Sequence, residues 1–173
     1  MFLGQILFSS LYPLPIYQPT NSPVGVVNES KNQEVNPKIL VEIFLAAQHK
    51  EDLPEIKKKF GAVSISINRV RAQFFKLGNP PQNIAIGRNV PASTARLAIQ
   101  IAIQYNQGIK YLLAEERLAT DYIAIGTSMF DELLQIPIAP EDLERLSDPS
   151  LSTPQFHTLY RHLTGEDKRS QPQ

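Results

Sequence analysis

The arrangement of apolar and polar residues is most regular between residues 83 and 128, where one short apolar run occurs twice. Residues 84–87 and residues 123–126 both have the sequence Ile-Ala-Ile-Gly. Short runs of this kind, with β-branched residues and a closing turn residue, are typical of buried strands. Residues 109–113 form a third apolar run. We therefore predict three strands in this part of the chain.

Polar residues between the first two strands follow the spacing of a helix. Pro91 suits the first helical position, and Gly108 suits the position just beyond the last. Within residues 92–106, steps of three and four residues make one narrow polar stripe of Ser93, Arg96, Gln100 and Gln104. Most other positions are apolar, and a helix with so little polar surface must be covered on most sides. We expect it to pack on the sheet and against a second element.

The order strand, helix, strand, loop, strand sets the expected topology of this central unit. A strand–helix–strand crossover is right-handed and makes its two strands parallel. The loop at residues 114–121 is short, which predicts that residues 109–113 and 123–126 pair as antiparallel neighbours. Gly87 and Gly126 then lie at opposite ends of the sheet, so we do not combine them into one site.

The segment before the central unit is predicted to be mostly helical. Residues 40–47 place apolar side chains at helical spacing, and we favour a helix there over a buried strand. Residues 52–60 begin with acids and end with three lysines, which suits a helix dipole, and Gly61 can end that helix. Residues 63–67 alternate as a short strand does, and Asn68 can cap a further helix. The apolar face of this last helix would comprise Val70, Phe74 and Leu77.

Two short helices are predicted after the central unit, at residues 140–146 and 153–163, and each starts near a proline. Residues 129–139 are mixed in character and receive no assignment. Together these elements predict a single α/β (or α+β) domain over residues 37–165, built on a small mixed sheet. Residues 166–173 are predicted to be a disordered polar tail.

Residues 1–36 differ in composition from the rest of the chain. Residues 1–17 are apolar and uncharged, lack the basic start of a signal peptide and are interrupted by two prolines. We interpret them as an arm that packs on the domain or as a remnant of a longer chain, and they leave export or membrane tethering open. Residues 18–36 are rich in Pro, Asn, Ser and Val, as linkers are.

Charge and cysteine content narrow the classes of function. The chain has 17 basic and 17 acidic residues, so no overall field favours nucleic acid or a membrane. Residues 37–90 nevertheless contain nine basic and four acidic residues, whereas residues 109–173 contain six and eleven. We interpret this uneven distribution of charge as an ordinary solvated surface. Head-to-tail contacts or a charged partner are the less favoured interpretation. The absence of cysteine excludes disulfides, thiolate nucleophiles and cysteine-ligated zinc.

One candidate binding site lies where the first strand of the central unit meets its helix. Gly87, Arg88 and Asn89 occupy that turn, and Ser93 follows near the start of the helix. Helix N-termini present free N–H groups and a positive dipole, so an anion could bind there beside Arg88. The alternative, which we favour, is a turn that needs Gly87 for its backbone and leaves Arg88 in water. No Gly-x-Gly-x-x-Gly or Walker pattern supports a nucleotide fold.

A second candidate is a basic face with aromatic neighbours, formed by Lys57, Lys58, Lys59, Arg69, Arg71 and Lys76. Such a face could bind nucleic acid, although core packing explains the neighbouring Phe74 better. The three histidines are not spaced to share a metal. Glu115, Glu116 and Asp121 suit a solvated loop better than acid–base catalysis. We therefore predict no catalytic residue, no metal site and no cofactor.

Part of the central unit resembles a known family. Residues 83–87, followed by Ala95 and Ala98 and then by the run ending at residues 123–126, are similar to half of a SPOR-type domain. That family comprises small α/β modules in which a strand ending in Val-Gly-Pro-Phe leads into a helix. The resemblance covers residues 83–127 and implies binding to septal peptidoglycan. Arg88-Asn89 stands here where the family has Pro-Phe.

The sequence as a whole favours a non-catalytic binding or regulatory interaction module, which could belong to a larger assembly or parent protein. Its expected partner is another protein or a second copy, and its expected compartment is the cytoplasm. Nucleic acid and membrane are not favoured as partners. Three alternatives remain: an anion- or nucleotide-binding enzyme domain that uses Gly87 and Arg88, a nucleic-acid binder that uses the basic face, and a SPOR-like peptidoglycan-binding module.

Overall fold

The structure, a computed structural model, describes residues 38–64, 67–106, 108–114, 118–128 and 135–166. The chain divides into two units, Met1–Glu34 and Val35–Gln173, and every described residue belongs to the second. The predicted arm and linker, residues 1–17 and 18–36, therefore lie outside the described residues. No helix within the described ranges is long and apolar enough to cross a membrane.

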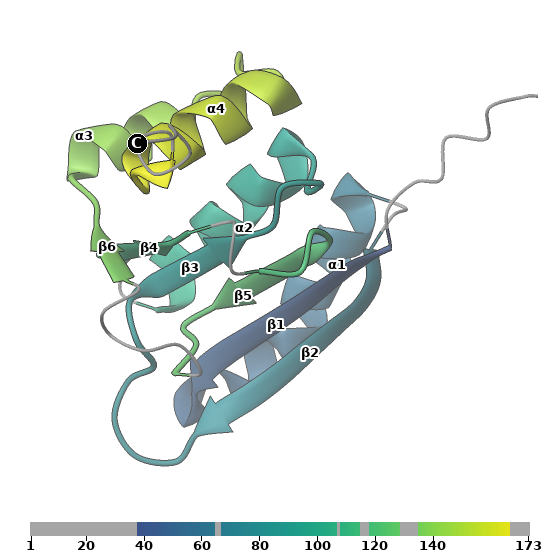
Figure 1. Ribbon diagram of the computed structural model, residues 1–173. Coiled ribbons are helices and arrows are strands. Elements are labelled where there is room, and N and C mark those ends of the chain that lie inside the picture. The colour runs from purple at the N-terminus through teal and green to yellow at the C-terminus, as the bar shows by residue number, and fades with distance from the viewer. Residues whose placement is uncertain (1–37, 65–66, 107, 115–117, 129–134, 167–173) are drawn as a thin grey trace, which may run out of the picture. The chain divides into compact units, whose positions relative to one another are not determined.

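The described residues form one mixed sheet in the order β2-β1-β5-β3-β4-β6, with helices beside it (Figure 1). The strands are β1 (Ile39–Ala46), β2 (Ile67–Phe75), β3 (Asn83–Ile86), β4 (Tyr111–Leu113), β5 (Tyr122–Ile125) and β6 (Gln135–Pro137). The helices are α1 (Leu53–Val63), α2 (Ala92–Tyr105), α3 (Pro140–Leu146) and α4 (Thr153–Leu163), and the 3-10 helix η1 (Ala47–Asp52) links β1 to α1. The predicted α/β class with a mixed sheet is confirmed.

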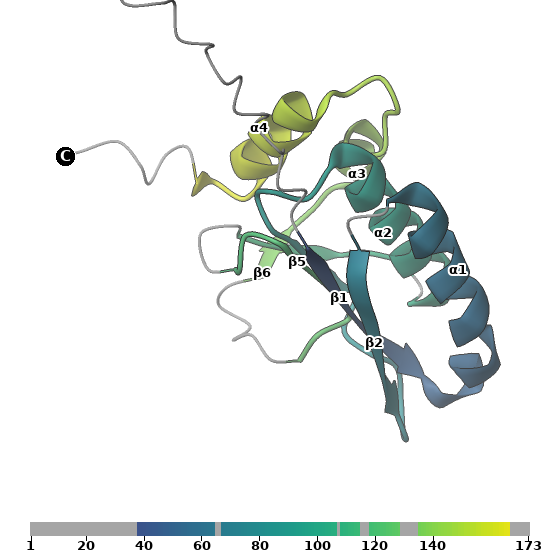
Figure 2. The same cartoon turned by 90° about the vertical axis from the view of Figure 1, so that its right-hand side faces the viewer.

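Two strand–helix–strand units make up most of the sheet, and β5 lies between them. β1 and β2 are parallel, as are β3 and β4, whereas β5 runs parallel to β1 and antiparallel to β3. The two units therefore run in opposite directions. Right-handed crossovers that run in opposite directions and diverge from the centre place their helices on the same face of the sheet. Figure 2 shows α1 and α2 together on one side.

The main core lies between this face of the sheet and the helices. All four α-helices contribute side chains to it, whereas the small cluster that includes Ala85, Leu113 and Ala124 contains only strand and loop residues. We call the face that carries this small cluster the open face. α2 contacts β3, β5, α1 and α4, and most of its residues are buried. The prediction of a helix covered on most sides is thus confirmed.

The pairing of β5 corrects one part of the predicted topology. β4 and β5 run antiparallel as expected, but the prediction that residues 109–113 and 123–126 pair is wrong, because β3 lies between β4 and β5. β5 is buried at three of its four positions and pairs with both β1 and β3, so a central place in the sheet satisfies its backbone on both edges. Gly87 and Gly126 do lie at opposite ends, since their N–H groups donate to Tyr122 O and Asn83 O respectively.

The predicted helix at residues 40–47 is wrong, because this segment forms β1. β1 pairs with β2 on one edge and with β5 on the other. From Ile43 to Ala46 its side chains are buried on both faces of the sheet, and Phe44 on the open face is only 5% exposed. A strand buried on both faces loses the alternation of apolar and polar residues. Its apolar positions then fit helical spacing as well as they fit a strand.

The predicted helix after Asn68 is also wrong, because residues 67–75 form β2. Val70 and Phe74 pack against the main core, as predicted, but they belong to a strand and not to a helix. Leu77 lies beyond β2 and is 90% exposed. The strand predicted at residues 63–67 starts only at Ile67, since α1 continues through Gly61 to Val63 and residues 65–66 lie outside the described residues.

The C-terminal helices α3 and α4 confirm the prediction of two short helices, whereas β6 was missed in the mixed segment at residues 129–139. β6 pairs with β4 through Ile136 and Leu112, and residues 129–134 lie outside the described residues. Glu166 corrects the predicted tail, because it is 6% exposed and accepts a hydrogen bond from the Thr164 hydroxyl at 3.1 Å. Residues 167–173 lie outside the described residues.

Candidate functional site

The turn between β3 and α2 uses most of its backbone N–H groups internally. The Gly87 amide donates to Tyr122 O at 2.8 Å, and the Asn89 amide donates to Thr120 O at 2.9 Å. The Val90 amide donates to Gly87 O at 3.0 Å, which closes the turn. The Gly87 and Asn89 amides are therefore engaged with β5 and the segment before it, the Val90 amide is engaged within the turn, and none of the three is directed at a ligand.

The N-terminus of α2 is in addition covered by α4. The Thr153 hydroxyl accepts a hydrogen bond from the Ala92 amide at 3.1 Å, and a His157 ring nitrogen lies 2.7 Å from Val90 O. Arg96 donates to Asp148 O and Leu151 O, which ties α2 to the segment between α3 and α4.

The structure therefore brings the predicted anion-site residues to one end of α2 without assembling donors around a common point. Gly87 is buried, whereas Arg88, Asn89 and Ser93 are exposed. An anion site would have to depend on the Arg88 guanidinium and on side chains in water, where such contacts are weak. The geometry favours the alternative interpretation, a turn whose amides hold the sheet together.

The residues of the predicted basic face lie on two sides of the sheet. Lys57, Lys58 and Lys59 belong to α1, and Lys59 is paired with Glu55 at 3.0 Å. Arg69 and Arg71 alternate along β2 with the core residues Val70 and Phe74, so they project from the open face. Lys76 follows β2. One continuous face that follows a nucleic-acid backbone is therefore not formed.

The open face carries one polar network across three neighbouring strands. The Tyr122 hydroxyl of β5 donates to the Glu42 carboxylate of β1 at 2.6 Å, and Arg71 of β2 lies 3.5 Å from the other oxygen of that carboxylate. Burial raises the pKa of the Tyr122 phenol above its usual value, and the hydrogen bond to Glu42 adds to this. Tyr122 therefore stays a neutral hydrogen-bond donor at neutral pH.

We expect this network to make stability fall at high pH. Because the phenol's pKa is higher in the folded than in the unfolded chain, its contribution is complete below about pH 10 and decreases above it. Tyr122→Phe should lose about 1 kcal/mol at pH 8, where the hydrogen bond to Glu42 is missing. It should also show a shallower decrease in stability above pH 10. Urea unfolding from pH 8 to 11 measures both effects, and equal slopes for the two proteins would contradict the assignment.

The two edges of the sheet differ in how they are protected. β6, at one edge, has three residues and ends at Pro137. β2, at the other edge, has nine residues, contains no proline and, among the described strands, pairs with β1 alone. Short edge strands and prolines block further pairing, whereas a long edge strand presents a row of unpaired N–H and C=O groups. We call the side of β2 that faces away from β1 the β2 edge.

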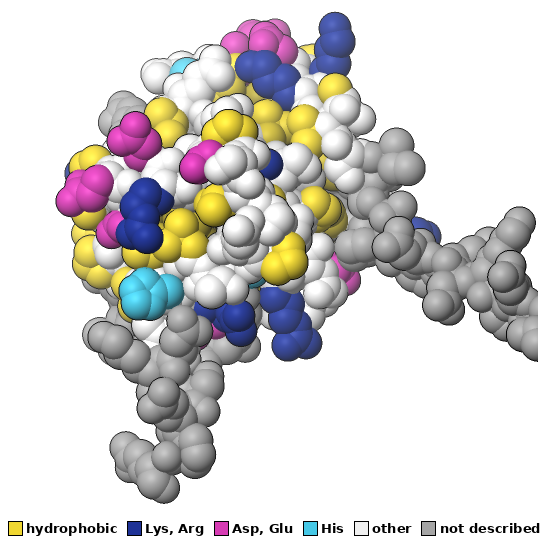
Figure 3. Space-filling model, turned by 90° about the horizontal axis from the view of Figure 1, so that it is seen from above, with side chains coloured by type: hydrophobic (Ala, Val, Ile, Leu, Met, Phe, Trp, Pro, Cys, Tyr) yellow, Lys and Arg dark blue, Asp and Glu magenta, His cyan; other side chains and the backbone are white. Residues whose placement is uncertain are grey.

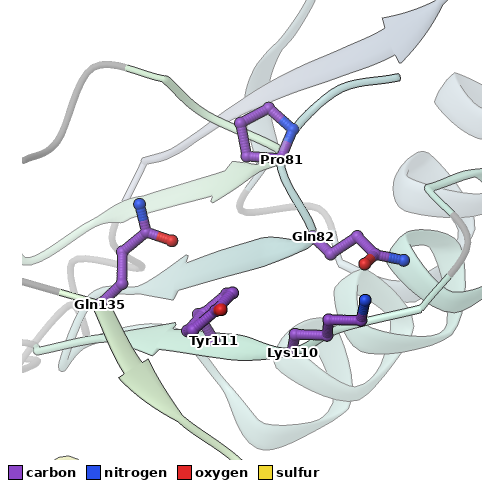
Figure 4. Close-up of a pocket in the computed structure, with 5 residues that line it drawn as sticks. All are labelled: Pro81, Gln82, Lys110, Tyr111 and Gln135. Carbon is purple, nitrogen blue, oxygen red and sulfur yellow. The ribbon is translucent and has the colours of Figure 1, made fainter. Parts of the chain in front are cut away.

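Two surface depressions lie elsewhere in the described residues. One has a volume of about 500 Å³ and lies between the segment before β3, the start of β4 and β6; Figure 4 shows the side chains around it, which are Pro81, Gln82, Lys110, Tyr111 and Gln135. The other has a volume of about 420 Å³ and lies between α3 and α4, with Leu159 and Pro154 as apolar lining residues. Seen from above α3 and α4, acidic, basic and hydrophobic side chains alternate (Figure 3). Lys110 and Tyr111 are the ionisable side chains around the first depression, and Arg145 and His162 are those around the second.

Comparison with known proteins assigns no family to this chain. No family model matches it, and no curated protein or solved structure matches it significantly. The SPOR resemblance therefore stays a prediction. Within the described ranges, no group of three or more histidine, aspartate or glutamate side chains could hold a metal ion.

The β2 edge is the feature that sequence reasoning missed. The signal was present, because Arg69, Arg71 and Gln73 alternate with Val70, Ala72 and Phe74. This period of two is typical of a strand with one exposed face. The predicted helix included Leu77 in its apolar face, and the spacing of residues 70, 74 and 77 was therefore preferred over the period of two.

Proposed function

We propose that this domain is a non-catalytic protein-binding module that accepts an extended segment of its partner as an additional strand beside β2. The observation that carries the proposal is the length and openness of the β2 edge. β2 pairs with β1 in continuous register from Arg69 to Phe75, after an irregularity at Asn68, and has no second neighbour among the described strands. About half of the backbone N–H and C=O groups of an edge strand point away from the sheet. Strand addition uses such groups for affinity.

The scaffold suits this role because β2 is held firmly on its other side. Val70 and Phe74 pack against the main core, and Phe75 makes an edge-to-face contact with Phe44 of β1 at 6.3 Å between ring centroids. A partner strand would thus meet a backbone that is already ordered, which lowers the entropy cost of binding. Regulation could act through any partner that competes for this edge.

The alternative functions receive less support from the described residues. An anion- or nucleotide-binding enzyme domain would need donors that the β3–α2 turn uses internally. A nucleic-acid binder would need one basic face, whereas the basic side chains lie on two sides of the sheet. A SPOR-like role in binding peptidoglycan rests on the sequence resemblance alone. These remain separate hypotheses, and the experiment below does not depend on them.

Titration of the full-length, isotope-labelled protein with three designed nine-residue peptides tests the proposal. The peptides alternate valine with glutamate, with threonine or with lysine. We expect at least one of them to bind with submillimolar affinity, to shift the amide resonances of β2 and to slow their hydrogen exchange. The resonances of β6 act as the internal control, because Pro137 and the short length of β6 prevent a matching response.

Peptides with N-methyl groups on alternate residues make this test specific for strand addition. N-methylation removes the N–H groups on one side of an extended peptide. One of the two alternating isomers should therefore keep its affinity, and the other should lose about tenfold or more, since each backbone hydrogen bond contributes about 1 kcal/mol. Absence of binding by all three parent peptides, or equal affinities of the two isomers, would refute the proposed function.

A further inference from the structure

We infer that the partner segment recognised at the β2 edge is acidic, and that it comes from a different protein rather than from a second copy of this chain; this inference rests on the proposed function. Basic side chains flank the β2 edge on both faces of the sheet. Arg69 and Arg71 project from the open face, and both are exposed. The side chains of an added strand would stand next to them at the spacing of neighbouring strands, about 4.8 Å.

Lys57 supplies positive charge on the other face of the sheet. Ile56 and Phe60 of α1 are fully buried and point into the core. At 100° per residue, Lys57 and Lys59 lie on opposite flanks of that buried line. α1 packs against α2 and over β2. The hydrogen bond to Glu55 raises the pKa of Lys59, and the charge of Tyr105 of α2 adds to this, so the Lys59 flank faces α2 and the centre of the sheet. Lys57 therefore lies on the flank away from α2, above β2, and is exposed.

Glu42 neutralises Arg71, with which it is paired, but no ion pair among the described residues neutralises Arg69 or Lys57. The Glu42 carboxylate is engaged by Tyr122 and Arg71. Glu55 is paired with Lys59, and Asp52 with His49. Arg69 has no ion pair among the described residues, and the exposed Glu51 lies beyond the far end of β1, about 20 Å along the sheet from it. The β2 edge therefore keeps a net positive charge that a partner can neutralise.

The same charges oppose pairing of β2 with β2 of a second copy. An antiparallel pair about a two-fold axis near the middle of β2 would bring Arg69 and Arg71 of one copy beside those of the other. Like charges on directly opposed residues destabilise a strand pair, and charged side chains on edge strands prevent self-association. A segment with glutamate or aspartate at alternate positions instead gains from every such neighbour. Charge repulsion thus disfavours pairing of two β2 edges, whereas charge attraction favours pairing of the β2 edge with an acidic strand.

The three peptides of the strand-addition experiment also test this inference. For the full-length protein in low-salt buffer, the glutamate peptide should bind at least about tenfold more tightly than the lysine peptide, with the threonine peptide between them. Its affinity should fall as salt is added, because exposed charges are screened. Arg69→Glu should remove most of this preference. Lys110→Glu makes the same change of charge beside β4, near the other edge of the sheet, and should leave the preference intact.

The outcomes separate this inference from the function on which it rests. All three peptides could bind equally while the two N-methylated isomers still differ in affinity. That result would support strand addition but refute the inference that the partner is acidic. Loss of the preference in Lys110→Glu would overturn it as well, by showing a response to net charge only. Sedimentation equilibrium of the protein alone tests whether two copies associate through the β2 edge, and we expect a monomer. A dimer that Arg69→Glu disrupts would refute the inference that the partner is a different protein. Circular dichroism of both variants checks that each is folded.

Discussion

Replacing Gly87 with alanine should destabilise the domain by about 3 kcal/mol, the upper range for added atoms in a packed site. A β-carbon at this position would meet the backbone carbonyl oxygens of Ala119 and Thr120, the latter at 2.6 Å. Backbone atoms cannot turn aside as a side chain can. The segment that carries them is bonded to the turn through Asn89 and Thr120, so the alanine would force the two apart. Urea unfolding monitored by circular dichroism measures the loss.

Gly126→Ala, in the second copy of the Ile-Ala-Ile-Gly sequence, should be at least as destabilising. Gly126 has φ +70°, a conformation that costs other residues about 1 kcal/mol or more. Its added β-carbon would also collide with the Asn106 side-chain nitrogen and lie 3.0 Å from Phe44 O. The Asn106 amide donates to that same Phe44 oxygen at 3.1 Å in the interior. Displacing Asn106 would leave a buried carbonyl without its donor.

Gly61→Ala is the matched control for both glycines. Gly61 lies within α1, and an added β-carbon would have no atom within 4 Å. Alanine is a better helix former than glycine, so this variant should gain about 0.5–1 kcal/mol. A loss of stability in Gly61→Ala, or unchanged stability in Gly87→Ala, would show that close approach of the backbone does not decide the effect.

Replacing Ile99 with alanine should cost about 3–4 kcal/mol, within the usual range for a buried isoleucine. Ile99 is completely buried in α2, which packs between the sheet and the other helices. Removing its side chain takes apolar surface out of the core and leaves a cavity that the sheet and helices cannot close. Equilibrium unfolding in urea gives the value directly, and a cost below about 1 kcal/mol would mean that α2 is not the packed centre of the domain.

Ile103→Ala provides the comparison within the same helix. Ile103 lies one turn after Ile99 and is 46% exposed. Its replacement changes the sequence of α2 in the same way, and alanine even has the higher helix propensity. We therefore expect a change of no more than about 0.5 kcal/mol. Similar losses for Ile99→Ala and Ile103→Ala would indicate an effect on the helix itself and not on its packing.

The central unit was predictable because its elements are marked locally. Glycines and prolines bound β3 and α2, and the narrow polar stripe of α2 indicates how much of the helix is buried. β1 and β2 were not predicted, for two different reasons. β1 is buried on both faces, so its apolar residues carry no period that identifies a strand. β2 has a clear period of two, but the apolar residues at positions 70, 74 and 77 also fit a helix.

The candidate site was predicted less well than the fold. Arg69 and Arg71 were found as basic residues, but they were grouped with the lysines of α1 because the segment between them was taken as helical. In β2 they project from the open face, whereas Lys57 lies on the other side of the sheet. These basic residues lie beside the β2 edge. The order of strands in the sheet decides which strand lies at an edge, and the sequence did not reveal that order.

The sequence by itself therefore determined the local elements of the central unit and the buried character of α2. These follow from short-range steric limits and from the period of apolar residues. Only the tertiary structure decided that β5 lies between β1 and β3, that the basic residues divide between two faces, and that the described strands leave one edge of β2 unpaired. The physical reason is that strand pairing joins residues far apart in the chain, and the free energy that selects one pairing comes from burial of the whole sheet.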